Sequence, residues 1–278
     1  MSDLVLVERF DKVARLTLNR PDRMNAINEP LREALEEHFR AFAEDDGVSV
    51  IILRGSGRGF CSGYDLQALP GSEAGSSPTY GEVPEIMRDR ARLRRTVERW
   101  LWLWSYPKPT IAEVHGFCLS GGGEMASMFD LTICSEDAVF GHPAARANGI
   151  PPTLSLWPLK IGLARTKELL FTGDTISGRE AAEWGIVNRC VPREELSDHV
   201  LALARRIANV PLEALTIHKH VANRWYELMG VRSMVDEGAD FDAIFHQLSV
   251  VKAFSELARE KGVKAALEAR DAPFKTAR

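Results

Sequence analysis

Residues 115–126 read HGFCLSGGGEMA and follow directly on the apolar run TIAEV at 110–114. The apolar run predicts a buried strand, and the glycines at 121–123 predict a tight turn that opens a helix near Glu124. Backbone N–H groups at the start of a helix lie where the helix dipole favours negative charge. This stretch therefore predicts a strand, a turn and a helix, with a turn that can hold an anionic oxygen.

A second glycine-rich stretch follows another apolar run: GSGRGFCSGYDL at 55–66 comes after VSVIIL at 48–53. Glycine lets the backbone approach a ligand closely and leaves N–H groups free to point at it. If the two turns lie side by side, each supplies one N–H donor to the same oxygen, and together they form an oxyanion hole. One such donor typically contributes ~3 kcal/mol of transition-state stabilisation.

Single residues exclude other interpretations of these glycines. Phe60 stands where a dinucleotide-binding fingerprint needs its third glycine, and no GK[ST] sequence indicates a phosphate-binding loop. Cys118 replaces the first glycine that a nucleophilic Ser120 would need in a GxSxG motif. A serine hydrolase is therefore not expected.

The first half of the chain alternates strand-like and helical patterns. Residues 4–19 predict a hairpin, a helix is expected to open near Asn28, and 86–105 predict a longer helix. Residues 70–85 are rich in Pro, Gly and Ser and predict a mobile loop. Because strands and helices alternate alike on both sides, this loop is not expected to be a domain boundary.

The second half changes character. Residues 131–134 and 138–140 predict a strand–turn–strand, whereas the chain from 196 onward is almost entirely helical in pattern. The sequence therefore predicts an α/β fold of repeated ββα-like units at 1–195, followed by a helical C-terminal subdomain at 196–278.

Composition is that of an ordinary globular protein. The chain has 278 residues, of which 45% are hydrophobic and 27% charged, with a formal net charge of -4. A slightly acidic chain is not expected to bind nucleic acid, and no apolar run reaches the ~20 residues that span a bilayer. The first residues lack the pattern of a signal peptide, so a cytoplasmic location is expected.

The chain has 4 cysteines, with no CxxC pair and no histidine at zinc-ligand spacing beside them. We expect reduced packing residues and no metal site. The arginines at 88–99 predict a solvated face with acidic neighbours, or alternatively a patch for an anionic group or RNA. The alternating Trp100, Trp102 and Trp104 cannot all lie on one buried face, so they are assigned to core packing, with a ligand pocket or a subunit contact as alternatives.

Six segments spread along nearly the whole chain share one further property. They are NRPDRMNAI (19–27), GRGFCSGYDL (57–66), HGFCLSGGGE (115–124), DLTICSEDAVFGHP (130–143), GREAAEWGIVNRCV (178–191) and APFK (272–275). In this order and spacing they resemble segments of the enoyl-CoA hydratase/isomerase (crotonase) superfamily. The resemblance implies a crotonase-type spiral of ββα units with a C-terminal helical trimerisation region, assembled as a homotrimer or hexamer.

The resemblance implies an enzyme of fatty acid metabolism that acts on an acyl-CoA thioester, most simply an enoyl-CoA hydratase-like lyase. Its oxyanion donors would be the N–H groups of Tyr64 and Gly121. Glu124, one helical turn after Gly121, would be the acid/base. No metal or redox cofactor is implied, because the coenzyme A thioester is itself the activated substrate. The implied CoA-binding residues are Arg23, Met24, Ala26, Ser62, Gly63, Asp65, Leu66, Phe274 and Lys275.

Two departures from the family pattern leave the reaction open. Family hydratases carry a second glutamate after the proline of FGxP, where this chain has Ala144. Some isomerases and dehalogenases of the family instead carry an aspartate some eight residues further on, but this chain has Pro152 there, which cannot transfer a proton. His142 is a candidate substitute, and Arg146 and Asn148 can orient a polar group. Tyr64 stands where alanine is common, so it reshapes the acyl pocket or hydrogen-bonds the substrate.

Because Ala144 cannot transfer a proton, an enoyl-CoA isomerase is the first alternative, since one base can remove and return a proton. A hydrolase, dehalogenase or decarboxylase of the same fold also fits. A non-catalytic CoA-thioester or RNA-binding member of the family is the alternative from another class of function.

Overall fold

The computed structural model describes residues 4–66 and 85–275. The loop predicted at 70–85 lies outside the described residues except for Glu85, whose carboxylate caps the next helix by accepting from the N–H groups of Met87 and Arg88. The predicted helix start at Asn28 is confirmed, because its side chain accepts from the N–H of Leu31.

A sheet of 6 strands forms the centre of the fold, in the order β1-β2-β3-β4-β6-β9. The predicted hairpin is its antiparallel edge, and the remaining neighbours pair in parallel. Parallel strands are buried on both faces, which explains why these segments read as continuous apolar runs. The strands are β1 (Val5–Phe10), β2 (Val13–Leu18), β3 (Val50–Gly55), β4 (Thr110–Val114), β6 (Leu131–Ser135) and β9 (Arg189–Val191).

A smaller sheet of 3 strands has the order β5-β7-β8. It contains β5 (Phe117–Leu119), β7 (Val139–Gly141) and β8 (Thr175–Ser177). The strand–turn–strand predicted around 131–140 forms, but its two strands belong to different sheets: β6 joins the large one and β7 the small one. The local sequence pattern predicts both strands, but the sheet to which each belongs depends on pairing with strands that are distant in the sequence.

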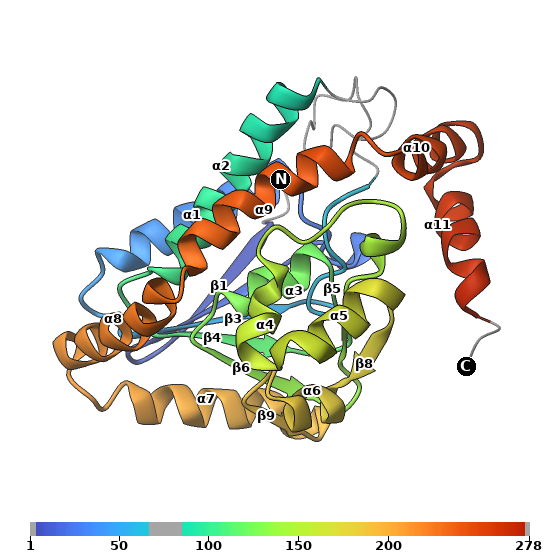
Figure 1. Ribbon diagram of the computed structural model, residues 1–278. Coiled ribbons are helices and arrows are strands. Elements are labelled where there is room, and N and C mark those ends of the chain that lie inside the picture. The colour runs from blue at the N-terminus through green and yellow to red at the C-terminus, as the bar shows by residue number, and fades with distance from the viewer. Residues whose placement is uncertain (1–3, 67–84, 276–278) are drawn as a thin grey trace.

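The helices pack on both faces of the large sheet (Figure 1). Ile51 and Leu53 of β3 face the main core, whereas Val50 and Ile52 face α7 on the opposite side. The helices are α1 (Glu29–Ala43), α2 (Ile86–Trp104), α3 (Gly121–Ser127), α4 (Trp157–Lys160), α5 (Gly162–Thr172), α6 (Gly178–Trp184), α7 (Leu196–Ile207), α8 (Leu212–Leu228), α9 (Val231–Phe245), α10 (Ser249–Lys261) and α11 (Val263–Asp271).

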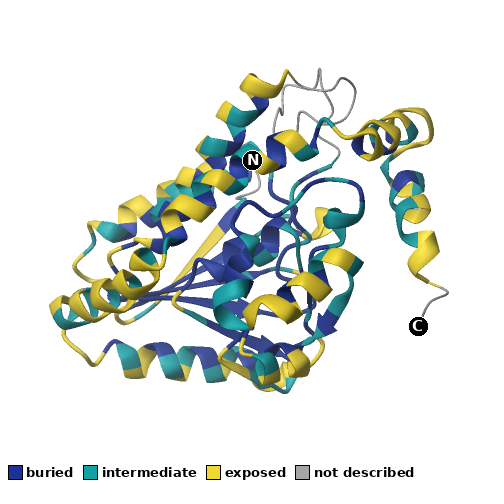
Figure 2. Cartoon of the chain, viewed as in Figure 1, coloured by how far each residue is buried: buried dark blue, intermediate teal, exposed yellow. Residues whose placement is uncertain are grey.

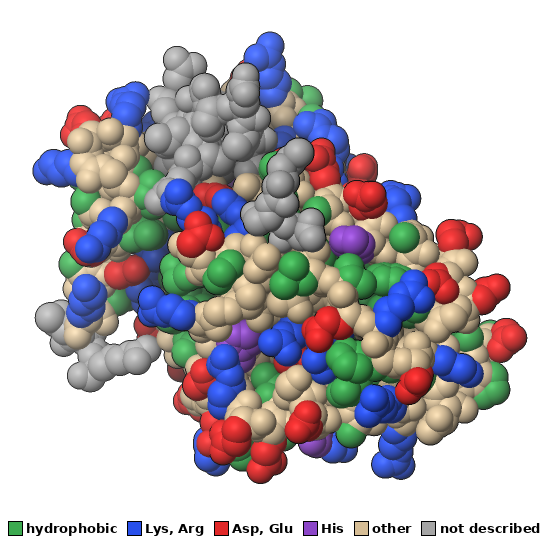
Figure 3. All heavy atoms as spheres, turned by 180° about the vertical axis from the view of Figure 1, so that it is seen from behind, with side chains coloured by type: hydrophobic (Ala, Val, Ile, Leu, Met, Phe, Trp, Pro, Cys, Tyr) green, Lys and Arg blue, Asp and Glu red, His purple; other side chains and the backbone are tan. Residues whose placement is uncertain are grey.

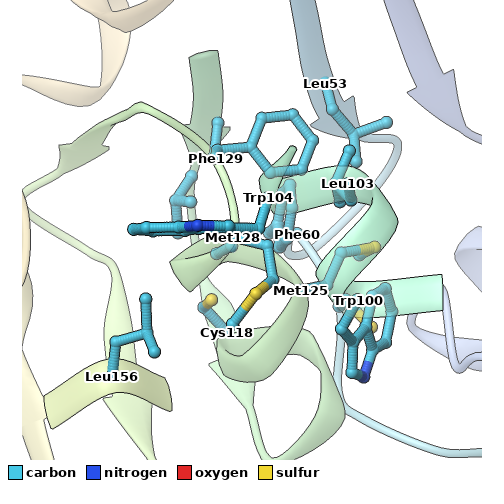
Figure 4. Close-up of a cluster of buried hydrophobic side chains, with 14 of the residues drawn as sticks. Leu53, Phe60, Trp100, Leu103, Trp104, Cys118, Met125, Met128, Phe129 and Leu156 are labelled. Carbon is cyan, nitrogen blue, oxygen red and sulfur yellow. The ribbon is translucent and has the colours of Figure 1, made fainter. Parts of the chain in front are cut away.

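The main core fixes α3 between the sheet and α2. Side chains from these elements converge in one buried cluster, with Met125 of α3 beside residues of α2 and β3 (Figure 4). Trp100 and Trp104 are buried there, as core packing predicts, and Trp102 makes edge contacts with Phe39 and Tyr106. This packing fixes the position of α3 and therefore of Glu124, which lies on it.

The C-terminal helices attach to the body in different ways. α7 packs on β3, β4 and β6, and α9 runs along α2. In contrast, α10 and α11 pack mainly on each other and extend to one side, and together with α8 they carry long exposed faces (Figure 2). Within residues 4–66 and 85–275, none of the helices has both the length and the apolar character needed to cross a membrane.

Gly238 brings α9 against the loop that precedes α4. A β-carbon at this position would lie 2.0 Å from the carbonyl oxygen of Pro152, which is backbone and cannot yield easily. An open helix position would gain up to ~1 kcal/mol from Gly→Ala. We expect Gly238→Ala instead to lower the free energy of unfolding by ~1–3 kcal/mol, measured by denaturant titration.

The matched control for this prediction is Glu237→Ala at the exposed neighbouring position, which should change stability little. A Gly238→Ala variant more stable than the parent would contradict the close contact between α9 and Pro152.

Candidate active site

A cavity of about 420 Å³ opens where the two glycine-rich turns meet α2, α9 and α11. Its walls include Glu124 from α3, Tyr64 from the first turn, and Ala144 from the segment after β7. Most of its lining surface is apolar with a few inward polar groups, which is typical of small-molecule sites.

Backbone pairing holds the two turns together. The Cys61 N–H donates to the Phe117 carbonyl at 2.8 Å, and the Leu119 N–H donates to the Cys61 carbonyl at 3.0 Å. Gly63 has φ +108, and a β-carbon there would lie 3.3 Å from the Gly121 nitrogen. Within the described part of the chain, the N–H groups of Tyr64 and Gly121 donate no hydrogen bond. The structure therefore places two available donors on adjacent turns.

The Tyr64 ring lies directly on Gly121. A β-carbon at Gly121 would lie 2.7 Å from Cε2 of this ring, so only glycine fits. The Trp100 indole N–H donates to the Tyr64 hydroxyl oxygen at 3.2 Å, and the Tyr64 O–H donates to Oε1 of Glu124 at 3.4 Å. Burial raises the pKa of Tyr64 well above its ordinary value, so the phenol stays neutral. In the sequence, the alternation of Trp100 with Trp102 and Trp104 did not indicate that Trp100 positions the Tyr64 phenol.

Glu124 is a fully buried carboxyl group on the cavity wall. Its Oε2 accepts from the Thr153 O–H at 2.9 Å and from the Thr153 N–H at 3.2 Å. Burial raises the pKa of Glu124 to about 7, although the hydrogen bonds from Thr153 and Tyr64 oppose this. A carboxyl group that titrates near neutrality can both give and take a proton. Sequence reasoning missed Thr153, which carries no motif.

Most residues predicted to bind CoA lie on the cavity wall. Gly63 is the exception in this region, because it faces the second turn. Asp65 also forms an ion pair with Arg20 at 2.9 Å. The predicted residues that line the cavity are Arg23, Met24, Ala26, Ser62, Asp65 and Leu66.

Asn25, which the sequence did not single out, fixes this wall. It is fully buried in the left-handed region at φ 54, and its amide donates at 2.9 Å to the carbonyls of Ser56 and Gly59. These bonds tie the segment around Met24 to the first glycine-rich turn.

Phe274 and Lys275 do not line the cavity in this chain. The Arg146 guanidinium lies 3.8 Å from the centre of the Phe274 ring and forms ion pairs with Asp174 and Asp271. Arg146 was a candidate for orienting a polar substrate group, and in the structure it joins α11 and the following residues to the core.

His142 lies on the cavity wall together with Ala144, but its ring nitrogens are turned to the protein. With the proton on Nε2, the ring donates to the Gly149 carbonyl at 3.3 Å, while Nδ1 is buried without a partner in the described part of the chain. Burial lowers the pKa of His142 to about 4, so the ring is neutral. This geometry favours a structural role.

A cluster of ionisable side chains that the sequence did not reveal lies between α2 and α9. Arg92 of α2, Asp242 of α9 and His246, which directly follows α9, line the cavity, and Asp89 of α2 lies behind them. His246 Nδ1 lies 2.6 Å from Asp89 Oδ2, and its Nε2 lies 3.5 Å from Asp242 Oδ1. The pairs Asp89/Arg92 and Asp242/His246 have helical spacing, but the packing that joins them is not visible in either segment alone.

The arginines of α2 are largely paired. Arg90 and Arg94 contact Asp240 of α9, and Arg99 contacts Glu29 of α1. Over the described residues of the face in Figure 3, basic and acidic side chains are also interspersed rather than gathered by sign. These pairs weaken the RNA-binding alternative.

All four cysteines are free thiols, as expected for packing residues. Burial raises the pKa of Cys61 to about 12, so it is unreactive. Across residues 4–66 and 85–275, no group of His, Cys, Asp or Glu side chains could hold a metal ion.

The sequence profile of the enoyl-CoA hydratase/isomerase family matches residues 8–277. This chain belongs to the enoyl-CoA hydratase/isomerase family. It is 31% identical to a probable enoyl-CoA hydratase of Rhizobium meliloti, over 98% of each chain. It is 32% identical to the 1,2-epoxyphenylacetyl-CoA isomerase of Escherichia coli, over 80% of this chain and 83% of that one.

The crystal structure of an enoyl-CoA hydratase from Mycobacterium smegmatis superposes with a TM-score of 0.89 at 33% identity. The match covers 98% of this chain and 94% of the other. The crotonase-type α/β fold with a helical C-terminal region is therefore confirmed for this family member.

Because Glu124 is buried with a raised pKa, it makes stability fall as pH increases. The folded chain keeps a proton, between pH 4.5 and about 7, that the unfolded chain releases. We expect Glu124→Gln to remove this penalty. The free energy of unfolding of the variant, relative to that of the parent, should therefore rise by about 3 kcal/mol between low pH and pH 8. Denaturant titrations at pH 4.5 and 8 measure this difference.

Glu183→Gln, at an exposed position on α6, is the control and should leave the pH dependence unchanged. A Glu124→Gln variant whose stability difference does not vary with pH would show that this carboxyl group titrates normally.

Proposed function

We propose that this protein is an enoyl-CoA hydratase-like enzyme that adds water to a 2-enoyl-CoA thioester. The observation that carries the proposal is the buried Glu124 carboxyl, which faces a cavity beside the available N–H groups of Tyr64 and Gly121. The names of the family relatives, hydratase and isomerase, support the same class of chemistry.

In the proposed reaction the thioester carbonyl oxygen accepts from the N–H groups of Tyr64 and Gly121. The oxygen of a water molecule bonds to Cβ and loses one proton to an acceptor on the cavity wall, while the electrons of the double bond move onto the carbonyl oxygen as an enolate. The two donors act where this negative charge develops, so they lower the barrier rather than only bind the substrate. Glu124 then delivers a proton to Cα.

An enoyl-CoA isomerase is the second candidate, and Ala144 is the observation that favours it. Isomerisation needs one base, which takes a proton from C2 of a 3-enoyl-CoA and returns it to C4. Glu124 alone can do this, whereas hydration also needs an acceptor for the proton of the attacking water.

We place coenzyme A along the wall formed by Arg23–Ala26 and Ser62–Leu66, with no metal or redox cofactor, because the thioester already activates the substrate. The proposed place of action is the cytoplasm, in fatty acid metabolism.

For the proposed trimer or hexamer, α8 and α9 supply an exposed apolar face. Its members are Ile217, Val221, Trp225, Leu228, Met229, Met234, Phe241 and Ile244.

The function is tested with crotonyl-CoA and a 3-enoyl-CoA, by following the absorbance of the conjugated thioester. Hydration removes this absorbance from crotonyl-CoA, and isomerisation creates it from the 3-enoyl-CoA. We expect Glu124→Gln to lower kcat by ~10²–10⁴-fold, because the proton-transfer group is lost, while Glu183→Gln keeps full activity. Turnover of neither substrate by the parent would refute both reactions.

The proposed assembly is tested at the apolar face. Trp225 is 71% exposed on α8, and a charge there should weaken contact between copies. We expect Trp225→Glu to lower the mass seen by sedimentation, whereas Phe171→Glu, at a position 80% exposed on α5, leaves it unchanged. A parent protein that sediments as a monomer would rule out the proposed oligomer.

A further inference from the structure

We propose that Asp242 is the second proton-transfer group of this active site and supplies the acceptor that Ala144 cannot provide. The inference rests on the proposed hydratase function. It follows from where α9 places this carboxylate, in a part of the chain outside the six segments quoted above for the sequence resemblance.

The first observation is that one short loop holds both carboxyl groups. The Ile150 N–H donates to Asp242 Oδ1 at 2.9 Å, and Thr153 holds Glu124 through its N–H and O–H. Gly238 allows α9 to lie against Pro152 of the same loop, one turn of helix before Asp242. Asp242 is therefore positioned relative to Glu124 by backbone contacts rather than by a flexible side chain alone.

The second observation is that Asp242, Glu124 and Ala144 line the same cavity. Asp242 is buried, with 5% of its surface exposed. Its Oδ1 is occupied by Ile150 and lies near His246, but no residue in the described ranges donates a hydrogen bond to Oδ2. This oxygen is the one available to a water molecule or a substrate atom.

The third observation is the support behind Asp242. His246 lies between Asp242 and Asp89, and Arg92 contacts Asp89 at 2.7 Å. Burial opposes a charge on His246, but the hydrogen bond to Asp89 and the two carboxylates raise the pKa of this imidazole. When His246 is protonated, its positive charge behind Asp242 favours an ionised carboxylate on the cavity side.

Both carboxyl groups can exchange protons near neutral pH. Burial raises the pKa of Asp242 to about 6 and that of Glu124 to about 7. The His246 imidazole lies on the Asp242 side and lowers the pKa of Asp242, so we assign Asp242 as the base and Glu124 as the acid from this contact. The titratable and charged groups that face this pair are Tyr64, Asp89, Arg92, His142, His246 and Arg270.

The proposed step balances as follows. The oxygen of a water molecule bonds to Cβ while one of its protons passes to Oδ2 of Asp242. The electrons of the double bond form the enolate at the oxyanion hole, and Cα then takes the proton of the Glu124 carboxyl group. Afterwards the proton on Asp242 passes through water to the Glu124 carboxylate, and the site is reset.

The experiment compares Asp242→Asn with Asp236→Asn, a control on the same helix outside the cavity. We expect Asp242→Asn to lower kcat for crotonyl-CoA hydration by ~10²–10⁴-fold, with KM changed only a few-fold, and to remove the acidic limb of the kcat/KM pH profile. Exchange of the Cα protons of butyryl-CoA in D₂O needs only Glu124 and the oxyanion donors, so it should persist.

Retained exchange also shows that Asp242→Asn is folded and binds the thioester. His246→Gln, which removes the support but not the carboxylate, should lower kcat less and shift the acidic limb. Hydration by Asp242→Asn at the parental rate, or equal loss of hydration and exchange, overturns the proposal while the proposed function stands. A parent protein that exchanges Cα protons without hydrating crotonyl-CoA overturns both.

Discussion

The backbone pairing between Cys61 and the strand at 117–119 is the constraint on which the site depends. It joins the ends of two separate strand–turn units, so that the N–H groups after Gly63 and Ser120 lie beside each other. Glu124 then follows on the helix that the second turn opens. Without this pairing the chain would present two ordinary turns, each with one donor, and no shared oxyanion site.

Burial and hydrogen bonding compete at Glu124, and burial decides the outcome. Thr153 and Tyr64 donate to the carboxylate and favour its charged form, but the surrounding core removes the water that would stabilise that charge. The result is a group that exchanges protons near neutral pH. The same burial makes the group unfavourable for stability when ionised, which is a common relation between active sites and stability.

Much of the fold and part of the site could be predicted from the sequence. Apolar runs such as 50–55 and the glycines before Glu124 are local signals, because strand burial and turn geometry act over a few residues. The resemblance to the family added the order of these units. The membership of β6 and β7 in different sheets could not be predicted, since it depends on pairing with strands far along the chain.

The polar support of the site also escaped prediction. Asp242 and His246 resemble an ordinary helical pair in α9, and Thr153 resembles an ordinary loop residue, until α9 packs against the loop at 150–153. Close approach at Gly238 is a three-dimensional property, and one sequence does not reveal which glycine provides it. His142 was the visible candidate near Ala144, but the fold turns its nitrogens away from the cavity.

The contact between the Tyr64 ring and Gly121 makes the side chains that these two positions can hold depend on each other. The nearest atoms to a β-carbon at position 121 all belong to the Tyr64 ring. A chain with a small residue at position 64 would leave room for a methyl group at 121, whereas the phenol permits only a hydrogen atom there. A side chain at position 121 therefore requires the Tyr64 ring to be displaced or replaced by a smaller group.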